Sequence, residues 1–254
     1  MTAQGRIRLR ILGIGMGPQH TTPEVAEALR GCDYVVAAQK HDDDGLLAAR
    51  REIAAAHGVE VVAVRDPERD RVSSSTGESA HYTGAVRAWH EARVAAYETV
   101  LRERGGTAAF LVWGDPSLYD STIRVVEQLA SRLPLDYDVL PGISAPQLLA
   151  ARHRLVLHPV GRPVHITTAR RLPEAVDAGQ TNIVVMLGSA PDLDGLADWS
   201  IWWGANLGAA GEELVTGRVG DVLPQLEEAR ARARAAAGWV MDVYLLRAPD
   251  ADPQ

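Results

Sequence analysis

Short apolar runs alternate with amphipathic stretches along the first half of the chain. Arg8–Ile14 is an apolar run that stops at glycines, and Tyr34–Ala38 is a second one. Between them, Thr22 suits a helix N-cap, Pro23 suits the first helical position, and Gly31 suits a helix end. The pattern predicts a strand, a glycine-rich loop, a helix and a strand, which together imply a parallel pair with a crossover helix.

The same alternation continues to about residue 152. We expect strands at 59–64, 107–112 and 137–140, and helices at 46–57, at 83–104, in the stretch before 132 and in the stretch before 152. A polar loop is expected at 65–79. Leu155–Pro163 is the best linker candidate because it contains Pro159, Gly161 and Pro163. We therefore expect an N-terminal α/β domain over 1–158 and a second domain over 159–254.

The second half predicts a smaller, mixed α/β domain. Expected strands cover 164–167, 182–187, 200–205, 213–216 and 239–247, and the clearest helix covers 222–236. The predicted fold class is α/β, with two α/β domains.

Charge and cysteine content exclude several classes of protein. The chain has 26 Lys and Arg against 33 Asp and Glu, a net charge of −7, which argues against nucleic acid as the main partner. Cys32 is the only cysteine, and no zinc-ligand spacing occurs, so we expect no disulfide and no metal site. No apolar run is long enough to span a bilayer, and the first residues do not form a secretory signal. We expect a cytoplasmic protein without a membrane partner.

Three loops follow predicted parallel strands, where ligands bind in open α/β sheets. They are Gly13-Ile14-Gly15-Met16-Gly17-Pro18, Trp113-Gly114-Asp115-Pro116 and Pro141-Gly142-Ile143-Ser144. Each has a plain structural alternative: a tight turn, an Asp-Pro turn, and a helix cap at Ser144. A dinucleotide site is disfavoured, because Pro18 replaces the third glycine and the second strand ends without an acid.

With these loops in this order, the chain resembles the tetrapyrrole methylases, a class of S-adenosylmethionine-dependent methyltransferases. The resemblance covers nearly the whole chain, including Met186-Leu187-Gly188 and Gly204-Ala205-Asn206-Leu207-Gly208. It implies two α/β domains with S-adenosylmethionine in a cleft between them, and S-adenosylhomocysteine as a product. It also implies cofactor-binding positions at Met16, Trp113, Gly114, Asp115, Leu118, Ser144, Ala145, Met186 and Gly204.

Several segments, such as Asp33–Lys40 and Val112–Ser121, are most similar to the members that methylate precorrin-5 at C1 and release acetate in cobalamin synthesis. The resemblance thus implies a C-methyltransferase with a tetrapyrrole substrate, and a homodimer. Two alternatives stay open. The chain could be a corrinoid methylase with a different target carbon, or a tetrapyrrole-binding protein without enzymatic activity.

Methyl transfer to an enamine-like substrate carbon needs no protein nucleophile, and the sequence shows no Ser/His/Asp or Cys/His constellation. Acetate release, by contrast, would benefit from a general acid or base. Asp115, Tyr82 and His81 are the main candidates by loop placement, with His20 and His41 besides. A polycarboxylate substrate would also need arginines. The candidates in or near predicted loops are Arg69, Arg71, Arg87, Arg170 and Arg171.

Overall fold

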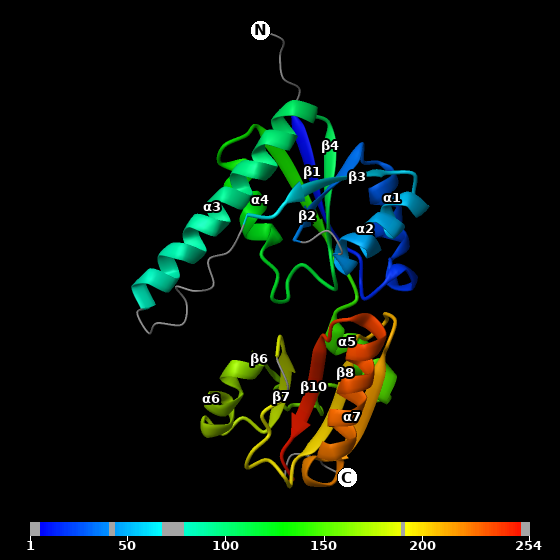
Figure 1. Cartoon of the computed structure of the whole chain (residues 1–254), viewed down its shortest axis with the longest axis vertical. Helices are drawn as coiled ribbons and strands as arrows, with labels where there is room; N and C mark the ends of the chain where they lie inside the picture. Colours follow the sequence, from blue (N-terminus) through cyan, green and yellow to red (C-terminus); the bar gives the residue numbers. More distant parts are fainter. Residues whose placement is uncertain (1–5, 41–43, 68–78, 189–190, 250–254) are drawn as a thin grey trace. The chain divides into compact units, whose positions relative to one another are not determined.

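The chain folds into two compact α/β units, which confirms the predicted fold class. The computed structural model describes residues 6–40, 44–67, 79–188 and 191–249. The units are Met1–Ile143 and Ser144–Gln254, each with its own five-stranded sheet (Figure 1). This division lies earlier than the boundary expected between 158 and 159. The reason is that helix α5 (Ala145–His153) packs on the second sheet, where Leu149 lies beside Gly204.

All five strands of the first sheet are parallel, in the order β3-β2-β4-β1-β5. The strands are β1 (Ile7–Gly13), β2 (Tyr34–Gln39), β3 (Glu60–Arg65), β4 (Thr107–Val112) and β5 (Leu135–Leu140). Most neighbours pair along six residues, but β2 and β4 pair only at Tyr34 with Ala108 and at Val35 with Ala109. Beyond these two pairs the strands separate toward their carboxyl ends.

Helices cover both faces of the first sheet (Figure 1). The helices are α1 (Pro23–Arg30), α2 (Gly45–Ala56), α3 (Ser79–Arg104) and α4 (Thr122–Ala130). One apolar cluster joins α3 and α4 to Leu9 and Ile11 of β1, and another joins α1 and α2 to Leu12 and Ile14. The N-terminus of α1 is as predicted, because the Thr22 side chain accepts a hydrogen bond from Val25 N at 3.2 Å.

Helix α3 begins earlier than expected. It starts at Ser79, so His81 and Tyr82 lie in its first turn and not in a loop before residue 83. Residues 68–78, most of the expected polar loop, lie outside the described residues, as do Arg69 and Arg71. The side chains of His81, Tyr82 and Arg87 are also outside them.

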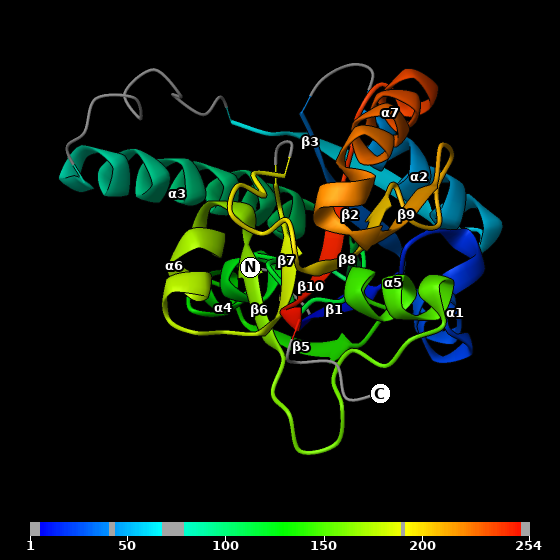
Figure 2. The ribbon, with the colours of Figure 1, turned by 90° about the horizontal axis from the view of Figure 1, so that it is seen from below.

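The second sheet is mixed, in the order β6-β7-β10-β8-β9, with only β6 and β7 parallel. Its strands are β6 (His165–Thr168), β7 (Asn182–Met186), β8 (Ser200–Ala205), β9 (Glu213–Arg218) and β10 (Asp242–Arg247). The last strand therefore starts at Asp242 and not at 239. Helix α6 (Leu172–Asp177) lies between β6 and β7. Helix α7 (Val219–Ala237) and α5 lie on opposite sides of β8 and β10 (Figure 2).

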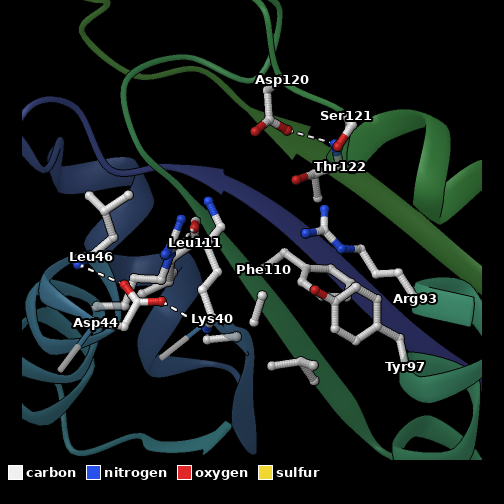
Figure 3. Close-up of a pocket in the computed structure, with 14 residues that line it drawn as sticks. Lys40, Asp44, Leu46, Arg93, Tyr97, Phe110, Leu111, Asp120, Ser121 and Thr122 are labelled. Carbon is white, nitrogen blue, oxygen red and sulfur yellow. Dashed lines mark hydrogen bonds between the residues drawn. The ribbon is translucent and has the colours of Figure 1, made fainter. Parts of the chain in front are cut away.

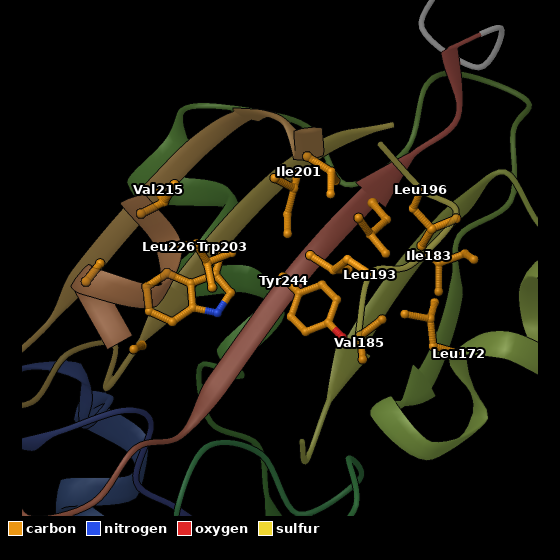
Figure 4. Close-up of a cluster of buried hydrophobic side chains, with 14 of the residues drawn as sticks. Leu172, Ile183, Val185, Leu193, Leu196, Ile201, Trp203, Val215, Leu226 and Tyr244 are labelled. Carbon is orange, nitrogen blue, oxygen red and sulfur yellow. The ribbon is translucent and has the colours of Figure 1, made fainter. Parts of the chain in front are cut away.

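Trp203 and Tyr244 are the largest side chains in the core of the second unit (Figure 4). They are directly opposite each other on the neighbouring strands β8 and β10, and they belong to the same apolar cluster as Leu226 of α7. Neighbouring Gly204 faces α5 instead, because successive residues of a strand point to opposite faces. This alternation explains why both helices find an apolar surface.

The expected linker 155–163 is part of the second unit. Asn182 donates hydrogen bonds to the carbonyls of Leu157 and Pro163, each at 3.0 Å. Arg247 donates to the Asn182 amide oxygen at 3.1 Å and to the Val156 carbonyl. Proline and glycine therefore mark an irregular surface segment here, and this segment is fastened to β7 and β10.

Candidate functional site

The three predicted loops of the first half meet beyond the carboxyl ends of β4, β1 and β5, which are neighbours in the sheet. Backbone hydrogen bonds join the first two: Gly15 N donates to Gly114 O at 3.2 Å, and Gly114 N donates to Gly15 O at 2.7 Å. Both glycines have positive φ, 67° and 75°. Glycine is favoured here because other residues rarely adopt that conformation.

Glycine is also required where the third loop crosses the first. A Cβ added at Gly142 would lie 2.2 Å from Gly114 O and 2.7 Å from the carbonyl carbon of Gly13. A Cβ added at Gly13 would lie 2.5 Å from Gly142 N. All these neighbours are backbone atoms, so main chain packs directly against main chain where the three loops meet. We call Gly13, Gly114 and Gly142 with these contacts the three-loop junction.

Asp115 fastens the junction. Its Oδ1 accepts hydrogen bonds from the Ser117 backbone N at 2.8 Å and from the Ser117 hydroxyl, and its Oδ2 accepts one from Gly142 N at 2.9 Å. Burial alone would raise the pKa of this carboxyl, but the hydrogen bonds from Ser117 and Gly142 outweigh burial and lower the pKa. Asp115 is therefore ionised at neutral pH, and both of its carboxylate oxygens already accept hydrogen bonds from Ser117 or Gly142.

Two apolar side chains accompany these loops. Met16 is buried, and Leu118 is half-buried in the turn closed by its N–H to Asp115 O at 3.2 Å. The indole Nε1 of Trp113 is buried, and within the described part of the chain it has no hydrogen-bond partner. The predicted first-unit positions thus lie together, and they include an unused buried donor.

Ser144 and Ala145 begin helix α5 in the second unit. Ser144 N and Oγ both donate to the Gln147 side-chain oxygen at 2.8 Å, and Ser144 is buried. Its side chain thus serves the helix start, as the plain structural alternative predicted.

Met186 and Gly204 lie in one row across the second sheet. Val243 of β10 pairs with Met186 of β7 on one side and with Gly204 of β8 on the other. A Cβ at Gly204 would lie 2.7 Å from Leu207 and 3.1 Å from Leu149. The glycine is therefore explained in part by packing within the unit.

The histidine and arginine candidates are dispersed. His20 ends a 3-10 turn (Pro18–His20) packed against Gly15, and its Nδ1 is buried without a partner among residues the structure describes. His41 lies outside the described residues. Arg170 and Arg171 are exposed in a 3-10 turn (Ala169–Arg171) of the second unit, where Arg171 pairs with Glu174 at 2.9 Å.

A second feature of the first unit escaped the sequence analysis. A pocket of about 160 Å³ opens where β2 and β4 separate (Figure 3). It is lined by Lys40 and Asp44 near the end of β2, by Arg50 of α2, by Arg93 and Tyr97 of α3, by Phe110 and Leu111 of β4, and by residues 120–122, among others. One signal was available: Lys40, the only lysine, follows a parallel strand directly.

Neither a metal cluster nor a membrane helix is found in the ranges the structure describes. No three His, Cys, Asp or Glu side chains there are grouped to hold a metal ion. No helix there combines the length and apolar character that crossing a membrane requires.

Comparison with known proteins agrees with this architecture. The chain is 42% identical over 258 residues to a precorrin-6A synthase [deacetylating] of Sinorhizobium sp., with 97% of each chain covered. A putative cobalamin synthesis related protein from Corynebacterium diphtheriae has 37% identity and a TM-score of 0.80, over 97% of this chain and 100% of the other. A cobalt precorrin-4 methyltransferase, at 18% identity and a TM-score of 0.65 over 97% and 96%, shows the same fold.

The family model of the tetrapyrrole (corrin/porphyrin) methylases matches residues 8–223, most of the chain. Together with the relatives above, this match identifies a methyltransferase of the cobalamin pathway. The chain belongs to the tetrapyrrole (corrin/porphyrin) methylases.

Proposed function

We propose that the protein methylates precorrin-5 at C1 with S-adenosylmethionine and releases acetate, giving precorrin-6A. The observation that carries this proposal is the 42% identity to a deacetylating precorrin-6A synthase across 97% of both chains. The match spans both units of the fold.

The predicted cofactor positions of the first unit are compatible with S-adenosylmethionine. Their loops lie beyond the carboxyl ends of neighbouring parallel strands, where ligands bind in open α/β sheets. The buried Trp113 Nε1 is a donor without a partner in the described part of the chain. We propose that this loop set binds the cofactor, together with Leu118 and Met16. Ser144, Ala145, Met186 and Gly204 would contribute from the second unit. A related uroporphyrin-III C-methyltransferase from Thermus thermophilus was solved with S-adenyl homocysteine.

When bound, the sulfonium cofactor supplies an electrophilic methyl group. The chain then has to orient the two reactants, because the nucleophilic carbon belongs to the substrate. We propose that Asp115 contributes by holding the Gly142 backbone and its own turn in place. Its ionised carboxylate is unsuited to donate a proton at neutral pH. For acetate release, a hydrolytic step, His81 and Tyr82 at the start of α3 are our proposed acid-base groups.

The products distinguish this function from its alternatives. The protein is incubated with precorrin-5 and cofactor carrying a ¹³C methyl group, and the products are analysed by mass spectrometry, by ¹³C NMR and by an acetate assay. Methyl gain at C1 with one acetate per turnover supports the proposal. Methyl gain alone, or at another carbon, would indicate a different corrinoid methylase.

Calorimetry with S-adenosylhomocysteine tests the cofactor site separately. We expect micromolar binding to the wild type and weaker binding to Asp115→Ala, because the junction loses its carboxylate bridge. A protein that binds tetrapyrrole but no S-adenosylhomocysteine would be a carrier and not a methyltransferase. The predicted homodimer, and a cytoplasmic protein without nucleic-acid or membrane partners, also remain part of the proposal.

A further inference from the structure

The pocket between β2 and β4 contains an arginine without an acidic partner. Arg50 Nε donates a hydrogen bond to the Leu111 carbonyl at 2.8 Å. Among the described residues, no carboxylate forms an ion pair with this guanidinium, so its other N–H groups have no acceptor there. Burial lowers the pKa of Arg50, since the surroundings disfavour its charge. A half-buried cation without a counterion is costly to maintain, which suggests that a ligand completes it.

The two carboxylates of the pocket attract Arg50 electrostatically without forming an ion pair with it, and each also accepts hydrogen bonding from the backbone. Asp44 caps helix α2: Lys40 N donates to its Oδ2, and the N–H groups of Leu46 and Leu47 donate to its Oδ1, each at 3.1 Å. Asp120 accepts from Thr122 N at 2.6 Å. Both acids thus hold backbone donors at helix starts. Arg93, by contrast, already has a counterion, because it forms a bidentate pair with Asp66.

Further donors line the same space. The hydroxyls of Tyr97, Ser121 and Thr122 make no side-chain hydrogen bond within the described part of the chain, and the ammonium of Lys40 pairs with no carboxylate there. Figure 3 shows Arg93 and Tyr97 on one side of the pocket and Lys40 and Asp44 on the opposite side. Tyr97 is buried against Phe110 with ring centroids 5.0 Å apart, which fixes its ring. The pocket therefore offers more donors than acceptors.

We propose that this pocket binds a carboxylate group, with Arg50 as its main partner and with Tyr97 and Thr122 as hydroxyl donors. A volume of about 160 Å³ suits a group of the size of acetate with water, and not a macrocycle. The carboxylate has two possible sources: a side arm of a polycarboxylate tetrapyrrole, or free acetate. The side-arm source rests on the proposed function, whereas the binding chemistry does not.

The single lysine makes the test selective. Reductive methylation with ¹³C-formaldehyde labels Lys40 at the pocket, and the N-terminal amine gives the other signal. Sodium acetate is titrated against sodium chloride at constant ionic strength. We expect a saturable shift of the Lys40 methyl signal that chloride does not reproduce. Loss of one hydrogen bond in Tyr97→Phe should weaken acetate binding by about threefold to tenfold.

Arg50→Gln should abolish the saturable shift. The matched control is Arg51→Gln, the next residue of α2, which is exposed and does not line the pocket, so acetate should bind as in the wild type. If Arg50→Gln does not fold, Tyr97→Phe decides, because it removes only a hydroxyl. The proposal is overturned if acetate gives no saturable shift, or if Arg50→Gln folds and binds acetate normally.

A second titration with uroporphyrin, a porphyrin with eight carboxylates, separates the sources. Displacement of acetate from the pocket supports a side arm as the occupant. Continued acetate binding beside bound porphyrin supports free acetate. If the protein binds acetate here but no S-adenosylhomocysteine, the carboxylate site is supported and the proposed function is refuted. The two hypotheses can therefore fail separately.

Discussion

A methyl group at residue 142 should force the three-loop junction apart. Gly142→Ala places a Cβ 2.2 Å from Gly114 O and 2.7 Å from two atoms of Gly13, the carbonyl carbon and oxygen. None of these atoms belongs to a flexible side chain, so relief requires movement of the β1 or β4 loop. The same movement would lengthen the hydrogen bond from Gly142 N to Asp115.

The cost can be estimated from this geometry. Overpacking typically costs about 1–3 kcal/mol, and contact with three rigid backbone atoms places this case at the upper end, about 3 kcal/mol. No cost for backbone strain is added, because Gly142 does not have a positive φ. For a chain of this size, such a loss lowers the melting temperature of the first unit by about 6–12 °C.

Differential scanning calorimetry measures the effect, with Gly31→Ala as the matched control. Gly31 ends α1 at a φ of −83°, and its added Cβ would lie 3.5 Å from the nearest atom, an ordinary contact. We expect Gly31→Ala to melt like the wild type or slightly above it. Equal melting of Gly142→Ala and Gly31→Ala would refute the inferred junction.

Three further outcomes follow from buried charge and thiol chemistry. Asp66→Asn leaves Arg93 without its counterion in a pair whose side chains are 8% and 13% exposed, so urea unfolding should show a loss of about 3 kcal/mol in the free energy of unfolding. The control Glu27→Gln, in an exposed pair, should change this free energy little. Equal effects would contradict this reasoning. The folded pKa of Asp115 lies below its unfolded value, so its contribution to stability holds above the unfolded pKa and is lost as pH falls through the folded pKa. The destabilisation by Asp115→Asn should therefore shrink below about pH 4, and a constant difference down to pH 2 would argue against the lowered pKa. Burial raises the pKa of Cys32 to about 11, so iodoacetamide at pH 8 should label it only after unfolding; rapid labelling of native protein would show an accessible thiolate.

Elements with local signals were predicted well from the sequence. Helix α1 has a capping side chain at Thr22, a proline at its first position and a glycine at its end, and its bounds agree with the prediction. Strand β4 also has the expected bounds, because Gly105-Gly106 and Trp113-Gly114 frame an apolar run. The three loops were placed correctly after their strands, since the carboxyl ends of parallel strands lie at one edge.

Features set by distant contacts were not predictable in the same way. Leu155–Pro163 has the composition of a linker, yet Asn182 and Arg247 bind it to the second sheet. The pocket around Arg50 depends on the short pairing of β2 with β4, which no local pattern reveals. Arg93 and Tyr97 share a face of α3, but their spacing is equally typical of a core-facing helix.

The order of the first sheet has a consequence for synthesis on the ribosome. Of these strands β1 leaves the exit tunnel first. It is flanked on both sides in the sheet, and its two neighbours, β4 and β5, are the last strands of that unit to be made. At about 5–20 residues per second, the nascent chain waits on the order of ten seconds before β1 can pair. During that interval Ile7, Leu9 and Ile11 lack the strands that later flank them. Nascent chains that stop before β5 should therefore depend on chaperones, whereas chains that include it can complete the first unit before the second is made.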